Sequence, residues 1–162
     1  MNLNQQIQLL IDNAPGDGRT AKMVQAIAPA LKQVAQQLQH SQYFILQSLN
    51  QDWVLTVLSN RGKPNLEKRA LYAFPTGEDA KMAPSSMQVG QAIALPIPVI
   101  HILFQTLAMD AVDSIVFFEK PGNLTVATEV RREDLQYLIQ VHLQQTQSRS
   151  STKRGNIPPD IA

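Results

Sequence analysis

The chain has no cysteine among its 162 residues, and its formal net charge is only +1. Without cysteine, disulfide bonds, thiolate zinc sites and cysteine nucleophiles are excluded, and the composition fits a reducing compartment. A protein that grips a phosphate backbone strongly usually has a larger basic excess. We therefore predict a cytoplasmic protein for which nucleic acid is a disfavoured partner.

Long apolar runs are also lacking. The longest, Ala92 to Phe104, is 13 residues long and is interrupted by Pro96, Pro98 and His101, whereas a membrane-spanning helix needs about 20 apolar residues. Residues 1–6 show neither the basic nor the apolar region of a signal peptide. We expect a soluble protein with no membrane partner.

Hydrophobic residues make up 44% of the chain, which is typical of an ordinary globular core. A chain of this length can bury about 68–70% of its unfolded surface in one domain. From residue 147 onward the sequence is rich in Ser, Thr, Arg, Lys, Gly and Pro and has almost nothing apolar to bury. We predict one domain over residues 1–146 and a disordered tail over 147–162.

Two amphipathic helices are predicted in the glutamine-rich N-terminal part. Asn2 or Asn4 can cap the first, whose apolar side carries Leu3, Ile7, Leu10 and Ile11. Asp17 or Thr20 can cap the second, which runs to His40 and should be kinked or split by Pro29. Its apolar stripe comprises Val24, Ile27, Leu31, Val34 and Leu38. We expect this stripe to cover the chain's own sheet, with a partner helix as the alternative, and Leu10 and Ile11 to remain as a candidate face for self-association or a partner protein.

After residue 42 the apolar period changes to that of strands. Alternating or β-branched runs predict strands at residues 43–49, 53–58, 69–74, 91–95, 114–119 and 124–130. Helices are predicted near residue 76, with Thr76 and Asp79 as a cap pair, from Pro98 to Asp110, and after Glu133. The fold class is therefore α+β: two N-terminal helices, a mixed and mostly antiparallel sheet of about five or six strands, and a C-terminal helix.

No catalytic or metal-binding constellation can be recognised. His40, His101 and His142 have no metal-ligand spacing, and the G-x-S-x-G elbow of serine hydrolases is absent. Asp110 and Asp113 are explained by turn chemistry, and Glu133 and Asp134 by the helix dipole. We predict no enzyme, no metal and no cofactor.

Two weaker binding hypotheses remain. Gly16, Gly18 and Thr20 at a helix start could present backbone N–H groups to a small anionic ligand, although the preceding strand, third glycine and lysine of a phosphate loop are missing. A weak nucleic-acid adaptor would use Arg61, Lys63, Arg69 and the tail. Basic residues cluster in three groups, and an adaptor should show them on one face: Arg61, Lys63, Lys68 and Arg69, then Arg131 and Arg132, then Arg149, Lys153 and Arg154.

Three segments between residues 53 and 139 resemble the enhanced-serine-sensitivity (SseB-like) N-terminal domain family. They are a strand leading into a Thr- and acid-bearing helix start at 71–80, a proline-opened apolar helix at 98–109, and a strand ending in a Pro-Gly turn at 113–122. Lys120 stands where the family typically has asparagine. The resemblance implies an α+β domain without assigned catalysis that is associated with protein–protein contacts. Together with the residues, it favours a non-enzymatic interaction or regulatory module whose partner is another protein or a second copy.

Overall fold

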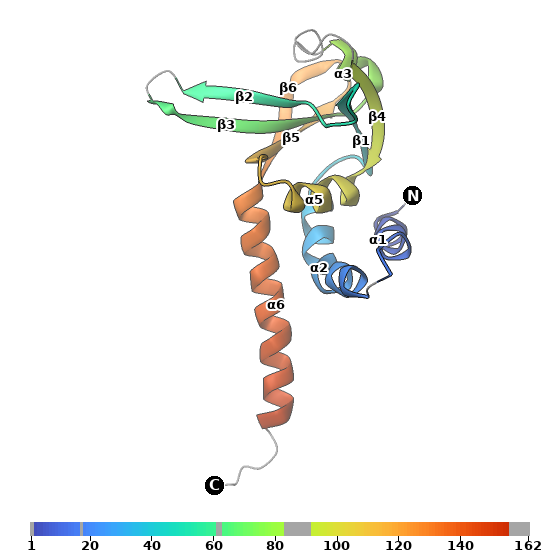
Figure 1. The fold of residues 1–162 in the computed structure, drawn as a ribbon, viewed down its shortest axis with the longest axis vertical. Helices are drawn as coiled ribbons and strands as arrows, with labels where there is room; N and C mark the ends of the chain where they lie inside the picture. Colours follow the sequence, from blue (N-terminus) through green and yellow to red (C-terminus); the bar gives the residue numbers. More distant parts are fainter. Residues whose placement is uncertain (1, 17, 61–62, 83–91, 156–162) are drawn as a thin grey trace.

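The computed structural model describes residues 2–16, 18–60, 63–82 and 92–155, and it contains helices and a mixed six-stranded sheet (Figure 1). The elements in chain order are α1 (Leu3–Asp12), α2 (Arg19–Ala35), β1 (Gln42–Ser48), β2 (Leu55–Asn60), β3 (Lys63–Phe74), α3 (Gly77–Met82), β4 (Ala92–Pro98), α5 (Val99–Ala108), β5 (Ser114–Lys120), β6 (Asn123–Arg131) and α6 (Arg132–Gly155). The predicted α+β class is confirmed.

The sheet has the strand order β4-β1-β3-β5-β6, with β2 paired to β3 beside this path. The β3–β5 pair is parallel, and the other pairs are antiparallel. The parallel pair arises because β4 and α5 intervene in the chain between β3 and β5. The mixed, mostly antiparallel sheet expected from the sequence is thus present.

The two N-terminal helices begin differently. Asn2 caps α1 through a capping box, in which its side chain accepts the backbone N–H of Gln5 while the Gln5 side chain accepts that of Asn2. The N-cap of α2 is Gly18, not Asp17 or Thr20 as predicted, and Asp17 lies outside the described residues. Gly18 has a φ of 74°, a left-handed conformation that favours glycine.

Pro29 does not split α2, which is one helix of 17 residues and ends at Ala35, before the predicted end at His40. One proline removes a single N–H donor from the helical ladder. The buried neighbours Ala28 and Ala30 hold this part of the helix in the core.

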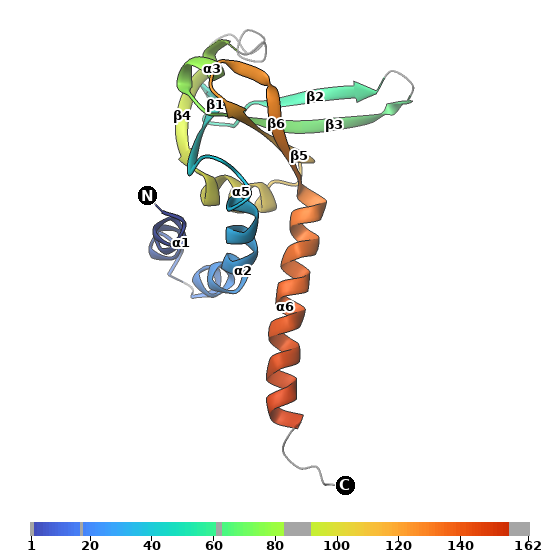
Figure 2. The same ribbon diagram turned by 180° about the vertical axis from the view of Figure 1, so that it is seen from behind.

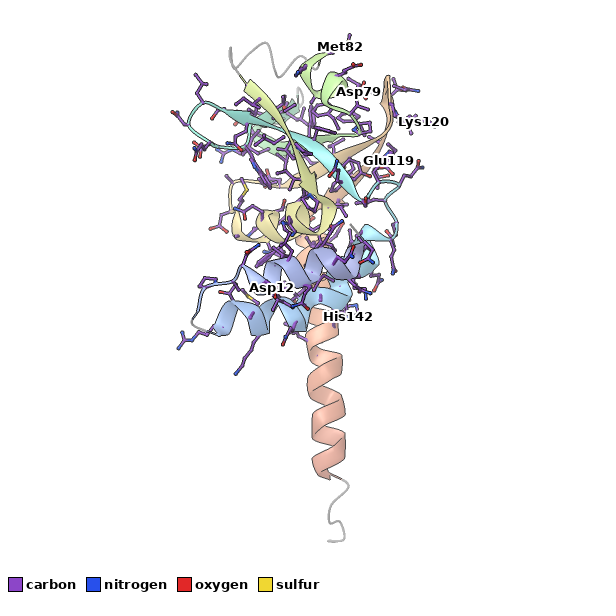
Figure 3. All side chains as sticks on the ribbon, turned by 90° about the vertical axis from the view of Figure 1, so that its right-hand side faces the viewer. Asp12, Asp79, Met82, Glu119, Lys120 and His142 are labelled. Carbon is purple, nitrogen blue, oxygen red and sulfur yellow. The ribbon has the colours of Figure 1, made fainter. Side chains whose placement is uncertain are left out.

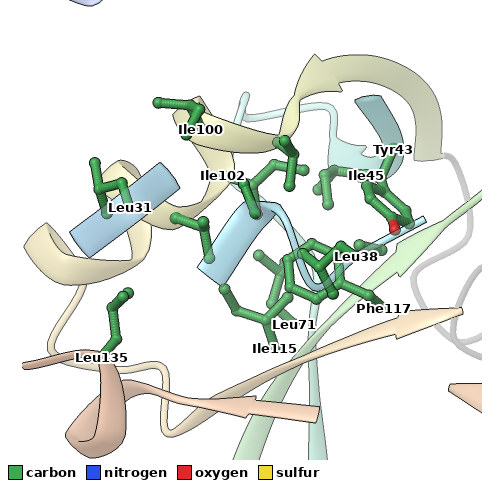
Figure 4. Packing of buried hydrophobic residues seen from close by; sticks show 14 of the residues in the cluster. Leu31, Leu38, Tyr43, Ile45, Leu71, Ile100, Ile102, Ile115, Phe117 and Leu135 are labelled. Carbon is green, nitrogen blue, oxygen red and sulfur yellow. The ribbon is translucent and has the colours of Figure 1, made fainter. Parts of the chain in front are cut away.

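Helices cover one face of the sheet in two layers. Figures 1 and 2 show α5 directly against the sheet, with α1 and α2 on the far side of α5. The start of α6 lies beside the C-terminal end of α5. Buried residues of all these elements form one core cluster (Figure 4). Leu31 of α2 and Ile100 of α5 lie in one part of it, and Tyr43, Ile45 and Phe117 of the strands in another.

The apolar stripe of α2 is buried within the chain itself, as expected. Val24 and Leu31 are fully buried and Ile27 and Leu38 nearly so. The neighbours differ in part from the expectation, because the helix contacts chiefly α1, α5 and α6. The proline-opened helix α5 occupies the position against the sheet that we had assigned to the N-terminal stripe.

The other face of the sheet carries a smaller apolar cluster around Leu46, Phe74, Ala80 and Phe118. Phe74 and Phe118 stack with ring centroids 5.1 Å apart. The short helix α3 lies on this face.

The predicted cap pair is present at the start of α3: the Thr76 hydroxyl accepts the Asp79 N–H at 3.1 Å and donates to the Asp79 carboxylate at 2.8 Å. Asp79 also accepts the Gly122 N–H at 3.0 Å, which ties α3 to the β5–β6 turn.

Two elements extend beyond this body. One is the arm, defined as residues 55–60 of β2 and 63–69 of β3, which projects as a two-stranded ribbon (Figures 1 and 2). The other is the second half of α6. We predicted a disordered tail from residue 147, but α6 continues to Gly155, because Gln, Ser, Lys and Arg do not break a helix. Residues 156–162 lie outside the described part of the chain, and the domain boundary at residue 146 stays a prediction.

Candidate functional site

The arm projects from the body of the sheet (Figures 1 and 2). Its two strands pair in register from Leu55 opposite Leu71 to Ser59 opposite Glu67. Val57 and Leu58, which point to opposite faces of the ribbon, are 52% and 39% exposed. Each face of the arm thus presents one exposed apolar side chain to solvent.

A cleft of about 590 Å³ lies at the base of the arm, where β3, β6 and α6 meet. Most of its lining is charged: Glu67 and Lys68 of β3, Asp113 before β5, Arg131 of β6, and Arg132 and Glu133 of α6. Basic and acidic side chains are equal in number here. The cleft therefore has no net preference for an anionic or a cationic ligand.

Most of these charges already serve the fold. Lys68 forms an ion pair with Glu129, and this hydrogen bond is the main reason why the pKa of Glu129 is lowered from its ordinary value, against a smaller opposing effect of burial. Arg131 contacts Glu133 at 3.4 Å. Such exposed pairs contribute about 0–1 kcal/mol each.

Arg132 closes the C-terminal end of α5. Its guanidinium donates to the carbonyl oxygens of Thr106 at 3.1 Å and Leu107 at 2.9 Å, and to Asp110 Oδ1 at 3.0 Å. Asp113 accepts the backbone N–H of Arg69 at 2.8 Å and so aligns the parallel strands β3 and β5. The turn chemistry predicted for Asp110 and Asp113 is thus replaced by contacts between distant segments.

The three basic groups named in the sequence do not form one free surface. Lys68, Arg131 and Arg132 are engaged as described above. Arg61 lies outside the described residues, as do the side chains of Lys63, Arg149, Lys153 and Arg154.

A buried polar cluster joins the end of α2 to β5. Glu119 is only 4% exposed. Its carboxyl group accepts the Tyr43 hydroxyl at 2.5 Å and the backbone N–H of Gln39 at 2.9 Å. His40 Nε2 donates to the Glu119 carbonyl oxygen at 2.7 Å.

Burial raises the pKa of Tyr43, and its hydrogen bond to Glu119 adds to the effect. Although carboxyl, phenol and imidazole groups meet here, Tyr43 is fully buried and cannot reach a substrate. The cluster therefore holds the fold together and does not present a reactive group.

The three histidines have different hydrogen-bond partners. Nε2 of His101 donates to the Gln6 carbonyl oxygen at 3.2 Å, and burial lowers the pKa of His101. Nε2 of His142 on α6 lies 3.1 Å from Gln33 Oε1. Figure 3 shows His142 beside the helices and Asp79 and Glu119 up near the sheet. Within the described ranges no group of three His, Cys, Asp or Glu residues could hold a metal ion, and no described helix has the length and apolarity needed to cross a membrane.

The residues predicted as an anion site lie in the loop between α1 and α2 and at the first turn of α2. Gly18 caps the helix without a side-chain hydrogen bond, and Thr20 already has an interaction within the protein. A methyl group added at Gly16 or Gly18 would meet no atom within 4 Å, so no close approach of another group requires glycine there. The glycine at position 18 is explained by its backbone angle alone.

The predicted partner face, Leu10 and Ile11, is half-buried and packs against the main core cluster. Its use by a partner stays a prediction. Sequence reasoning missed Gln6, which is 1% exposed in α1 and donates to the Ser41 carbonyl oxygen at 2.8 Å while accepting the Ile100 N–H at 2.9 Å. The sequence did offer one signal for the burial of Gln6: it directly precedes Ile7 and so lies at the border of the apolar side of α1.

No family model, curated protein or solved structure matches this chain. The elements that carry the SseB-like resemblance are present as the end of β3 with α3, as α5, and as β5 with its turn. Membership of that family stays an expectation.

Proposed function

We propose that this chain is a non-enzymatic protein-interaction or regulatory module of the cytoplasm. The observation that carries the proposal is the arm, which extends from the body with exposed apolar side chains on both faces. A two-stranded ribbon is marginally stable by itself in water, so an arm of this kind gains stability when another chain covers it. The engagement of the cleft's charges in ion pairs and helix capping supports a binding role over a chemical one.

A photo-crosslinking amino acid at position 58 tests the proposal in cells that express the chain. Position 93 is the matched control, because Ile93 is 53% exposed but lies in β4, away from the arm. We expect a discrete protein adduct from position 58 and none, or a much weaker one, from position 93. Equal labelling at both positions, or no adduct from position 58, would contradict the proposal.

Cell fractionation tests the cytoplasmic location in the same strains. The tagged full-length chain should be recovered with cytoplasmic markers. Recovery with an exported or membrane fraction would remove this part of the proposal without affecting the interaction test.

A further inference from the structure

The junction between α1 and α5 is built around one buried side chain. Gln6 of α1 donates from Nε2 to the Ser41 carbonyl oxygen at 2.8 Å and accepts the Ile100 N–H at 2.9 Å. The same Ser41 oxygen accepts the Val99 N–H at 2.9 Å. The N-cap residue of α5, Pro98, makes no side-chain cap hydrogen bond, so these contacts satisfy the first two N–H groups of the helix. The beginning of α5 is therefore capped by α1 and by the segment before β1.

A histidine lies at the same junction. His101, the third residue of α5, donates from Nε2 to the Gln6 carbonyl oxygen at 3.2 Å. It is half-buried, and burial lowers its pKa from the ordinary value of 6.5, while the hydrogen bond to Gln6 opposes this shift to a smaller extent. A positive charge in the first turn of α5 is also unfavourable because the positive end of the helix dipole lies there. The junction therefore suits a neutral imidazole and disfavours an imidazolium.

No described carboxylate compensates a charge on His101. The elements that pack chiefly against α5 are α1, α2, β4 and α6. Their charged side chains are Asp12 on α1, Arg19, Lys22 and Lys32 on α2, and, where α6 meets α5, Arg132, Glu133 and Asp134, whereas β4 has none. Asp12 accepts a hydrogen bond from Gln8 and lies roughly 9 Å along the helix from Gln6. None of these groups is among the causes of the shift in the His101 pKa.

α1 is less embedded in the molecule than α5. Of the ten residues of α1 only Gln6 and Ile7 are buried, whereas Ile100, Ile102 and Leu103 of α5 are fully buried. Figures 1 and 2 show α1 at the periphery, on the far side of α5 from the sheet. Elements with few buried contacts open at a lower free energy than the core does. A change that weakens the junction should therefore separate α1 from the body before it disturbs the sheet.

We propose that α1 is a pH-sensitive latch, which is released from α5 when acid protonates His101 and closes again when His101 loses the proton. Release uncovers the apolar surfaces of α2 and α5 against which α1 packs. Because the pKa of His101 is lower in the closed form, the released form binds more protons below about pH 6.5, and the closed form loses stability as the pH falls. The ratio of released to closed α1 can rise at most about tenfold per pH unit. The latch does not depend on any binding by the arm.

Amide hydrogen exchange of the full chain tests the latch between about pH 7.5 and about pH 5, with the intrinsic pH dependence of exchange removed. We expect protection of the α1 amides to fall below about pH 6.5, by up to about tenfold per pH unit, while the amides of β3 and β5 keep their protection. Parallel loss in α1 and β5 would mean that the whole fold opens and would overturn the proposal. Constant protection of α1 over this range would do the same.

His101→Gln is the decisive variant, because glutamine keeps an N–H donor near the position of Nε2 but cannot be protonated. Protection of its α1 amides should no longer change with pH. His142→Gln is the matched control, because His142 forms a hydrogen bond to Gln33 on the exposed side of α6, away from the junction. It should respond to pH as the original chain does. An equal pH response in His101→Gln and the original chain would assign the release to another group and exclude the latch.

If His101→Gln does not fold, the imidazole resonances of the original chain decide. The chain has three histidines, and the resonance of His101 can be assigned by its nuclear Overhauser contacts with Gln6. We expect this resonance to titrate below 6.5, over the same pH range in which the α1 amides lose protection. A His101 that titrates at 6.5 or above, or that titrates while α1 stays protected, would overturn the proposal.

Discussion

Replacing Tyr43 with phenylalanine removes one hydroxyl from the buried cluster that joins α2 to β5. The hydroxyl donates to Glu119 at 2.5 Å and accepts the backbone N–H of His40 at 3.3 Å. Glu119, at 4% exposure, then keeps only the Gln39 N–H as a donor to its carboxyl group. Removing one partner of a buried hydrogen bond costs about 1–3 kcal/mol, so we expect a loss of about 2 kcal/mol in the free energy of unfolding.

Thermal and urea unfolding followed by circular dichroism measure this loss. For a chain of this size about 2 kcal/mol lowers Tm by roughly 4–8 °C. Tyr72→Phe is the matched control, because it deletes the same hydroxyl from a half-buried tyrosine on the other face of the sheet. If Tyr43→Phe and Tyr72→Phe were equally stable, the cluster would not hold the two segments together.

The pH dependence gives a second readout. The pKa of Tyr43 is raised above its ordinary value of 10.0, so its contribution to stability is complete below that pH. Above it the unfolded chain releases the proton while the folded chain retains it, and stability falls by up to about 1.4 kcal/mol per pH unit. Tyr43→Phe should lack this part of the alkaline loss. If Tyr43→Phe lost stability above pH 10 as steeply as the original chain, the folded environment would not be what keeps the Tyr43 hydroxyl protonated.

Three further predictions concern the helices. Gln6→Ala should cost about 2–3 kcal/mol in urea unfolding, because two buried backbone groups lose their partner, whereas Gln8→Ala on the exposed side of α1 should cost under about 0.5 kcal/mol. Leu31→Asp should abolish the folded circular dichroism spectrum by placing a charge in the core, while Met23→Asp, at a 51% exposed position of the same helix, should not. Truncation after Thr146 should change Tm by no more than about 2 °C, and a drop of about ten degrees would mean that the removed residues dock on the body.

Local sequence patterns were sufficient for most elements. The alternation in Tyr43–Leu49 and Leu124–Val130 depends on the two-residue repeat of a strand, and the strands appear near the predicted positions. Thr76 and Asp79 form the predicted cap pair because both partners lie within one turn of the chain. The three- and four-residue spacing of the α2 stripe was enough to predict that the stripe is buried. These features depend on neighbours a few residues apart.

The candidate site could not be predicted in this way. Trp53–Leu58 reads as a strand, but whether its edge is covered depends on where β1 and β4 lie, which no local pattern encodes. Arg132 and Asp113 have ordinary local explanations, yet their partners are 22 to 44 residues away along the chain. The helix cap of α2 was also mispredicted, since a left-handed glycine can replace a capping side chain.

The sequence by itself determined the α+β class, the positions of the helices and strands, and the absence of cysteine chemistry, because each depends on composition or short-range periodicity. Only the tertiary structure decided that α5 and not α2 lies against the sheet, that Glu119 is buried beside Tyr43, and that β2 extends from the body with an open edge. The reason is physical. Burial and strand pairing are properties of segments brought together from distant parts of the chain, and their outcome depends on which segments compete for the same surface.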